Sequence, residues 1–380
     1  MSFQAPESPD APLRLAVIGG GHLGRIHAKL ASANDQFEVV AVADPSFDSR
    51  ELVEQQLGLP SVEDYQALLG KIDAAVVAAP TLAHYEITST LLRAGVHCLV
   101  EKPLTLSTDQ AQRLVQIAAN HRRVLQVGHV ERFNPMWTVA QSEIGSPKFI
   151  EATRFGPYSG RSTDIGVVLD LMVHDLDLIL SLNRSEVRSI QASGVAVLGS
   201  HEDIAEARIE FESGCIAIVK ASRIAQNPTR RMQVYSSNGF ADIDFSGESV
   251  EVVSPTAEVL SRSVHLDELP AADRMEAKNT VYGELFKTRS ITAPKRNAIL
   301  DEQNDFALSI QTGAAPSVTG EDGARAVQVA CEIIEQIQAH AWDGPTSKPW
   351  RVGPVATEGP RILPMPERGT EQDQPQRRAG

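Results

Sequence analysis

The stretch LRLAVIGGGHLG, residues 13–24, is a β-branched run that leads directly into a glycine-rich loop. Gly19, Gly21 and Gly24 fit the spacing GxGxxG, in which the first glycine allows a tight turn, the second lets a pyrophosphate approach the backbone, and the third lets a helix pack on the strand. A helix that starts at His22 and Leu23 would offer free N–H groups to phosphate. The stretch therefore predicts a strand–loop–helix unit that binds a dinucleotide.

The segments that follow, up to residue 128, repeat this strand–helix alternation. Strands are predicted at Leu13–Ile18, Phe37–Ala43, Ala74–Ala79, Val96–Val100 and Val124–Val127, with helices at His22–Ser32, Ser49–Leu57, Leu82–Ala94 and Ser107–Asn120. Nearly continuous apolar strands are typical of a parallel sheet that is covered on both faces. We therefore predict a doubly wound α/β domain over residues 13–128.

Asp44 ends the second predicted strand, 20 residues after Gly24. A carboxylate at this place accepts hydrogen bonds from an adenosine ribose and repels a 2′-phosphate. The pattern favours NAD over NADP as the cofactor. The alternative is a glycine-rich turn followed by an exposed aspartate.

Beyond residue 148 the pattern changes to short strands joined by Gly, Ser and Asn turns, which is typical of an antiparallel sheet. Helices are predicted at Asp164–Ser181 and Gly320–Ala339. We expect residues 129–340 to form an α+β domain with a large, mainly antiparallel open sheet that binds substrate and a second copy of the chain. Residues 1–12 are predicted to be disordered, and residues 341–380 to form a Pro- and Gly-rich tail.

The composition excludes several functional classes. The chain has 380 residues and a formal net charge of −14, which disfavours general binding to nucleic acid or anionic membranes. No run of 18 apolar residues is present, and the N-terminus lacks the features of a signal peptide. Three widely spaced cysteines suggest no disulfide framework and no CxxC metal site. A cytoplasmic protein without a metal is the expectation.

Polar residues follow the ends of three predicted strands, where ligands bind in an open α/β sheet. Glu101 and Lys102 precede Pro103, and a lysine there can donate to a substrate hydroxyl. Pro80, Thr81 and His84 follow another strand end and can line a cofactor cleft. The alternative is that Lys102 and His84 are ordinary surface residues.

Asp170 and His174 lie four residues apart in a predicted helix, so they share one face. Histidine carries protons near neutral pH, and a carboxylate one turn away can orient it. A core histidine beside an acidic turn is one alternative reading. A divalent metal site is another, although no third ligand is evident.

His129 and Arg132 lie just past another strand end. Residues 121–163 carry six basic side chains against three acidic ones, and arginines suit bidentate recognition of phosphate. We expect Arg132, Arg154 and Arg161 to contact an anionic ligand.

Taken in order, the Gly19–Gly24 loop, Pro80–His84, Glu101-Lys102-Pro103 and the Asp170/His174 pair resemble the Gfo/Idh/MocA family of NAD(P)-dependent oxidoreductases. The resemblance covers roughly residues 13–340. It implies a catalytic set of Lys102, Asp170 and His174, with Lys102 or His174 as the base that takes the hydroxyl proton. It also implies that the cofactor contacts a set of residues at the strand ends: Gly19, Gly21, His22, Leu23, Gly24, Asp44, Pro80, Thr81, His84, Glu101, Lys102 and His129.

Two segments are similar to those of UDP-N-acetylglucosamine 3-dehydrogenases: residues 128–135, and Tyr158 to Arg161 leading into residues 163–175. This resemblance implies oxidation of C3 of a nucleotide-linked sugar on the way to an amino sugar, with Tyr158 among the substrate contacts. A dehydrogenase of a free polyol or pyranose is the alternative within the family, and a non-catalytic dinucleotide-binding regulator is the alternative outside it. The open sheet predicts a homodimer or a dimer of dimers.

Overall fold

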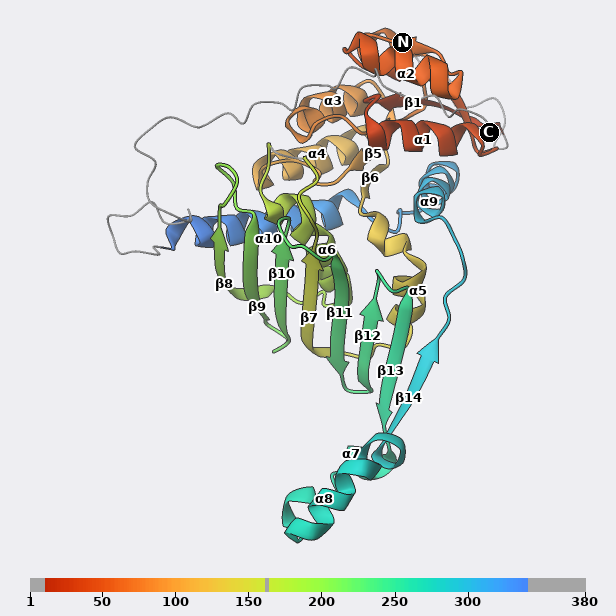
Figure 1. Cartoon of the computed structure of the whole chain (residues 1–380). Coiled ribbons are helices and arrows are strands. Elements are labelled where there is room, and N and C mark those ends of the chain that lie inside the picture. Colours follow the sequence, from red (N-terminus) through yellow and green to blue (C-terminus); the bar gives the residue numbers. More distant parts are fainter. Residues whose placement is uncertain (1–10, 161–163, 341–380) are drawn as a thin grey trace, which may run out of the picture.

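The structure is a computed structural model, and it describes residues 11–160 and 164–340. Two β-sheets organise this part of the chain, one above the other in Figure 1. The predicted disordered start, apart from Ala11 and Pro12, and the predicted tail both lie outside the described residues.

The first sheet has six parallel strands in the order β3-β2-β1-β4-β5-β6. The strands are β1 (Leu13–Ile18), β2 (Phe37–Ala43), β3 (Ser61–Val62), β4 (Ala74–Val77), β5 (His97–Glu101) and β6 (Leu125–Gly128). The connecting helices are α1 (His22–Ser32), α2 (Phe47–Leu57), η1 (Tyr65–Leu68), α3 (Thr81–Arg93) and α4 (Thr108–His121). The strand order reverses between β1 and β4, which is the switch point where ligands bind in such sheets. The predicted doubly wound sheet is confirmed.

Strand β1 shows why this sheet needs helices on both faces. Ala16 and Ile18 point into one apolar cluster, whereas Leu15 and Val17 point into another. The second cluster is completed by Phe306 of α9 (Ala298–Thr312), a helix that the sequence analysis did not identify. Helix α9 therefore packs against the N-terminal sheet although it is almost 170 residues downstream of β6.

The second sheet has eight strands in the order β14-β13-β12-β11-β7-β10-β9-β8. The strands are β7 (Pro147–Phe155), β8 (Val187–Val195), β9 (Ile204–Phe211), β10 (Ile216–Ser222), β11 (Thr229–Ser236), β12 (Gly239–Asp244), β13 (Ser249–Pro255) and β14 (Phe286–Ile291). All neighbouring pairs are antiparallel except β7 and β10, which run parallel. This mixed, mainly antiparallel sheet confirms the predicted fold class.

Helices cover one face of the eight-stranded sheet (Figure 1). They are η2 (Val130–Phe133), α5 (Pro135–Gln141), η3 (Val168–Met172), α6 (Val173–Leu182) and α10 (Gly320–Ala339). The helix predicted at Asp164–Ser181 begins later and has two parts, because η3 is a π-helix and only α6 is α-helical. A helix boundary therefore falls between Asp170 and His174.

Between β13 and β14 the chain forms a projection beyond the sheet, which contains α7 (Ala257–Leu260), η4 (Leu266–Glu268), α8 (Ala271–Thr280) and η5 (Val281–Leu285) (Figure 1). Across the residues that the structure describes, no helix has the length and apolarity needed to cross a membrane.

Candidate functional site

The glycine loop at the end of β1 has the shape that phosphate binding requires. Gly19 has a φ of 109°, and a Cβ there would lie 2.5 Å from the Ala78 carbonyl oxygen. A Cβ on Gly24 would lie 1.8 Å from the Gly19 carbonyl oxygen, so only glycine lets α1 approach the loop this closely. Gly21 faces open space, and no side chain caps the first turn of α1 at His22 and Leu23. The free N–H groups of this turn suit an anionic ligand.

Asp44 lies beside this loop and is held by backbone groups. Its Oδ2 accepts a hydrogen bond of 2.7 Å from the Gly20 amide, and its Oδ1 accepts one of 2.8 Å from the Ser46 amide. Arg50 donates to the backbone oxygens of Asp44 and Pro45. The carboxylate is therefore fixed at the tip of β2, next to the glycine loop.

Pro80 is the N-cap of α3 and Thr81 is its first residue, at the same edge of the sheet. His84, one turn into α3, is 1% exposed, and its ring nitrogens lie 2.9 Å from the Pro103 oxygen and 2.8 Å from the Ala79 oxygen. Burial lowers the pKa of His84. The ring thus ties the loop after β4 to the loop after β5. His84 is thus buried between these two loops, and its expected place in the cofactor cleft stays a prediction.

Lys102 and Asp170 come together across the two sheets. Lys102 Nζ donates to the Asp170 backbone oxygen at 2.7 Å and lies 3.5 Å from its Oδ1. Asp170 is part of the π-helix η3, a local irregularity that often occurs at functional sites. The ion pair joins the end of β5 to the helices of the second sheet, and both side chains remain partly exposed.

His174 follows in the first turn of α6. Its Nδ1 is buried and has no hydrogen-bond partner among the described residues. Burial, with the positive charges of Lys102 and Arg154, lowers the pKa of His174 well below its usual range. The ring is therefore neutral at physiological pH and can accept a proton. The structure brings together all three residues of the expected catalytic set.

His129 lies beside this set, after β6. The side chain is fully buried, and neither ring nitrogen has a partner in the part of the chain that the structure describes. Burial lowers the pKa of His129, and the charges of Asp177 and Arg132 act on it with opposite signs. A buried ring with two unsatisfied nitrogens is rare and marks a place where a ligand can supply a partner.

Two of the three arginines that we expected to bind ligand are already engaged by carboxylates. Arg154 is 3% exposed and binds Glu131 at 2.8 Å and Asp175 at 2.8 Å. Arg132 binds Asp177 through two hydrogen bonds of 2.6 Å and 2.9 Å. These ion pairs lock η2 and β7 against α6. In this structure carboxylates hold both guanidinium groups, and the expected contact of these arginines with an anionic ligand stays a prediction.

The third arginine, Arg161, lies outside the described residues, and Tyr158 just before it is 51% exposed. Another arginine, Arg230, was not identified as a site residue from the sequence. It is paired with Arg154 in the register of β11 and β7, so its side chain is on the same face of the sheet as α6. Its charge acts on the pKa of His174, Asp175 and Glu131. Arg230 is exposed and its guanidinium binds none of the described carboxylates.

The loop before η3 is held by two further residues that the sequence analysis did not identify. Arg223 donates to the Ile165 oxygen and binds Asp203 at 2.7 Å. A Cβ on Gly166 would lie 1.9 Å from Glu202 Oε1. Only glycine leaves room for Glu202, whose Oε1 accepts a hydrogen bond from the Val168 amide. The register of Asp170 depends on these contacts.

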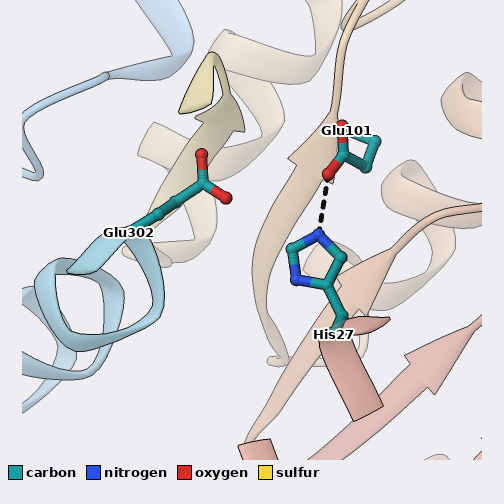
Figure 2. A group of neighbouring side chains, drawn as sticks. All are labelled: His27, Glu101 and Glu302. Carbon is teal, nitrogen blue, oxygen red and sulfur yellow. Dashed lines mark hydrogen bonds and ion pairs between the residues drawn. The ribbon is translucent and has the colours of Figure 1, made fainter. Parts of the chain in front are cut away.

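Glu101 points into a buried group with His27 and Glu302 (Figure 2). Its Oε1 lies 2.7 Å from His27 Nε2, and its Oε2 accepts from the Lys102 amide at 3.2 Å. Glu101 is 8% exposed and was expected to contact cofactor. We find it instead beneath the loop that carries Lys102.

Comparisons with known proteins show the family to which the chain belongs. Residues 13–129 match a family model described as "Oxidoreductase family, NAD-binding Rossmann fold", and residues 138–242 match the "GFO/IDH/MocA C-terminal domain". The chain is 32% identical over 329 residues to UDP-N-acetylglucosamine 3-dehydrogenase from Acidithiobacillus ferrooxidans, which covers 86% of this chain and 98% of that protein.

A solved structure of that dehydrogenase aligns with a TM-score of 0.75 and 31% identity, over 86% of this chain and 98% of that one. Myo-inositol 2-dehydrogenase from Thermotoga maritima is 27% identical, over 83% of this chain and 93% of the relative. Both named relatives are dehydrogenases, but one acts on a nucleotide-linked sugar and the other on a free polyol.

Proposed function

The chain belongs to the GFO/IDH/MocA oxidoreductase family, and from this premise we propose that it uses NAD to oxidise C3 of the sugar in UDP-N-acetylglucosamine. The match to the NAD-binding Rossmann model indicates a nicotinamide dinucleotide cofactor. The relatives that are named as dehydrogenases indicate that the chain is an oxidoreductase. The observation that carries the chemistry is the convergence of Lys102, Asp170 and neutral His174 beyond the strand ends of the sheet with the glycine loop.

The residues around the glycine loop fit a dinucleotide. Gly19 and Gly24 shape the turn, Gly21 leaves open space, and the uncapped start of α1 offers N–H groups to the phosphates. Asp44 favours NAD, because a fixed carboxylate at the end of β2 accepts from a ribose 2′-hydroxyl and repels a 2′-phosphate. A dinucleotide held by these residues would supply a nicotinamide as the hydride acceptor.

Within the catalytic set we assign proton acceptance to His174. Its ring is neutral and its side chain is only partly buried, whereas Lys102 Nζ already donates to Asp170. Lys102 then places a donor at the substrate hydroxyl, and its positive charge favours the alkoxide that forms as the proton leaves. Asp170 holds Lys102 in this position.

Two observations support a nucleotide-linked sugar. The relative named as a UDP-N-acetylglucosamine 3-dehydrogenase aligns over nearly its whole length. Arg230 is exposed, lies on the face that carries His174, and has no carboxylate partner among the described residues. An arginine in this position suits the diphosphate of a nucleotide sugar. Tyr158 and Arg161 are further candidates at the start of the same region.

A free polyol or pyranose is the second candidate, because inositol dehydrogenases align over much of the chain. The two candidates differ in the diphosphate. NADH formation should be measured with UDP-N-acetylglucosamine, N-acetylglucosamine, glucose and myo-inositol, with a coupled step that removes the keto product. Our proposal requires turnover of the nucleotide sugar, and turnover confined to the free sugars would contradict it.

The Arg230→Ala variant sharpens this test. If Arg230 binds the diphosphate, KM for the nucleotide sugar rises by roughly tenfold or more, which corresponds to the loss of about 1.5–3 kcal/mol for a charge-assisted hydrogen bond. The KM for NAD should not change. The exposed Arg188, which pairs with Glu212 at the far edge of the sheet, gives a matched control as Arg188→Ala. An unchanged KM in Arg230→Ala would remove Arg230 from the site.

We further propose that the chain forms a homodimer or a dimer of dimers through the sheet face that lacks helices. Tyr235 contacts both Phe149 and Phe240 there and is 37% exposed. Their neighbours in the chain, Ile150, Val234 and Ala241, point into the core, so the aromatic side chains lie on the opposite face. Apolar side chains that gather on an open sheet face are typical of an interface. Light scattering that finds only a 41.1 kDa species would contradict this.

A further inference from the structure

The buried group beneath the Lys102 loop contains a carboxyl with no compensating partner. Glu302 of α9 is 0% exposed, and neither carboxyl oxygen has a hydrogen-bond partner among the described residues. Its carboxyl oxygen, a His27 ring nitrogen and a Glu101 oxygen all lie within 4.8 Å of one another (Figure 2). An isolated carboxylate in such a place is costly, so it must be neutralised by a cation or by a proton.

The hydrogen bonds of His27 indicate whether a cation or a proton neutralises Glu302. The Gln303 amide nitrogen lies 3.1 Å from the His27 backbone oxygen, which can only accept, so this nitrogen is the donor group of the side chain. The same nitrogen lies 3.2 Å from His27 Nδ1, which therefore accepts as well. The proton of the neutral ring is then on Nε2, which donates to Glu101 at 2.7 Å.

A protonated Nε2 has no lone pair for a metal ion. The bond between His27 and Glu101 also occupies the space between two of the three potential ligands. The neutral ring carries no charge that would balance Glu302, and Lys102 Nζ is directed to Asp170. A proton is thus the neutralising group that leaves the hydrogen bonds of His27 and Glu101 intact.

We propose that Glu302 is a neutral carboxylic acid at physiological pH, and that in this state it positions Glu101 and, through it, the loop that carries Lys102. Deprotonation would place a second negative charge beside Glu101, whose Oε2 accepts from the Lys102 amide. Burial, with the negative charges of Glu101 and Asp305, raises the pKa of Glu302 well above its ordinary range, in agreement with the geometry. The link to Lys102 rests on the proposed function, whereas the protonation of Glu302 does not.

The surrounding groups explain why this proton is retained. The charged or titratable groups that face Glu302 are His27 from α1, Glu101 from β5 and Asp305 from its own helix. His27 Nε2–H is directed to Glu101, and the bond from His27 holds the pKa of Glu101 low against the effect of burial. The group therefore contains one fixed negative charge, on Glu101, and a neutral Glu302 avoids repelling it.

The Glu302→Gln variant tests the protonation, because an amide resembles a neutral carboxylic acid in shape. An acid whose folded pKa is raised contributes stability that is fully present below its unfolded pKa of about 4.3 and is lost as pH rises toward the folded value. Glu302→Gln has no such loss. We expect its Tm to match the wild type near pH 4 and to exceed it by several degrees near pH 8. Glu335→Gln, an exposed control on α10, should leave the pH dependence unchanged.

Two further readouts distinguish a proton from a cation. The wild type should show the infrared carbonyl band of a protonated carboxyl at pH 7, and Glu302→Gln should lack it. Metal analysis of the purified protein should find no bound divalent cation. A stoichiometric metal that is lost in Glu302→Gln, together with a lower Tm, would overturn the proposal, as would the absence of the infrared band. These measurements need no substrate, so they stand apart from any failure of the proposed reaction.

The positioning role has its own readout. Ionisation of Glu302 should reduce kcat of the wild type at alkaline pH, and Glu302→Gln should shift that limb to higher pH or remove it. Glu302→Ala should lower kcat more than Glu302→Gln, since the amide fills the same space without a negative charge beside Glu101. Identical alkaline limbs in the wild type and Glu302→Gln would refute the positioning role.

Discussion

His174 and Asp175 are neighbours in α6, yet the two side chains lie in opposite kinds of environment. His174 has an unpartnered ring nitrogen and belongs to a set with two partly exposed groups, Lys102 and Asp170. Asp175 is buried and binds Arg154 through two hydrogen bonds. We call Lys102, Asp170 and His174 the open set, because its groups can form new contacts with a ligand. We call Arg154, Glu131 and Asp175 the closed set, because its charged groups are already paired with one another. Whether a side chain already has its hydrogen-bond partners therefore distinguishes a reactive group from a supporting group, which the residue type alone does not do.

The largest expected effect comes from removing the open set. The double variant Lys102→Ala/His174→Ala should lower kcat by about 10²–10⁴-fold or more, because it loses the proton acceptor and the donor to the hydroxyl. NAD affinity, measured by calorimetry, should change little, since the glycine loop and Asp44 are untouched. Turnover close to that of the wild type would contradict the assignment of both residues.

Breaking the closed set should affect stability first. Arg154→Met leaves Glu131 and Asp175 as buried, uncompensated carboxylates, so the free energy of unfolding should fall by about 3–5 kcal/mol. Arg188→Met removes an exposed pair with Glu212 and should cost less than about 1 kcal/mol. Denaturant unfolding would measure both. If Arg154→Met keeps its stability and only KM for the sugar rises, Arg154 binds ligand as we first expected.

A pH profile tests the state of His174. The base must be neutral to accept a proton, and its pKa is lowered well below the usual range. The acid limb of kcat/KM should therefore lie well below the ordinary histidine value of about 6.5, with a tenfold loss per pH unit beyond it. An acid limb at or above that value would show that the ring is not desolvated in the working enzyme.

The smallest expected effect is a change in the preference for NAD over NADP in the Asp44→Ala variant. Asp44→Ala removes the carboxylate that accepts from the Gly20 and Ser46 amides, so KM for NAD should rise by roughly tenfold while KM for NADP falls. The ratio of kcat/KM for the two cofactors measures the change. If the wild type already prefers NADP, the role given to Asp44 is incorrect.

The fold follows from local sequence patterns to a large extent. The glycine loop, the apolar strands of the first sheet and the hairpins of the second sheet all depend on residues close together in the chain. Helix α9 was not predicted from the sequence, although its residues Phe306 and Ala307 complete the core of the first sheet. The partners of these apolar residues are set by the tertiary structure, because α9 packs against strands that lie about two hundred residues or more before it in the sequence.

The candidate site is predictable in its composition but not in its contacts. Lys102, Asp170 and His174 were identified from the sequence, and the structure brings them together. The fate of each arginine was not predictable, because Arg154 meets Asp175 and Glu131 only after β7, η2 and α6 have packed. The same holds for Glu302, which lies 201 residues from Glu101 in the sequence. Charge pairing across such separations is a property of the fold.

One measurement tests the central proposal most directly. UDP-N-acetylglucosamine that carries deuterium at C3 should be incubated with the protein and NAD, and the reduced cofactor analysed by mass spectrometry. We predict that the nicotinamide gains one deuterium in the wild type and that the Lys102→Ala/His174→Ala variant transfers almost none. Reduced cofactor without deuterium, or no reduction although free sugars are oxidised, would contradict the proposed reaction.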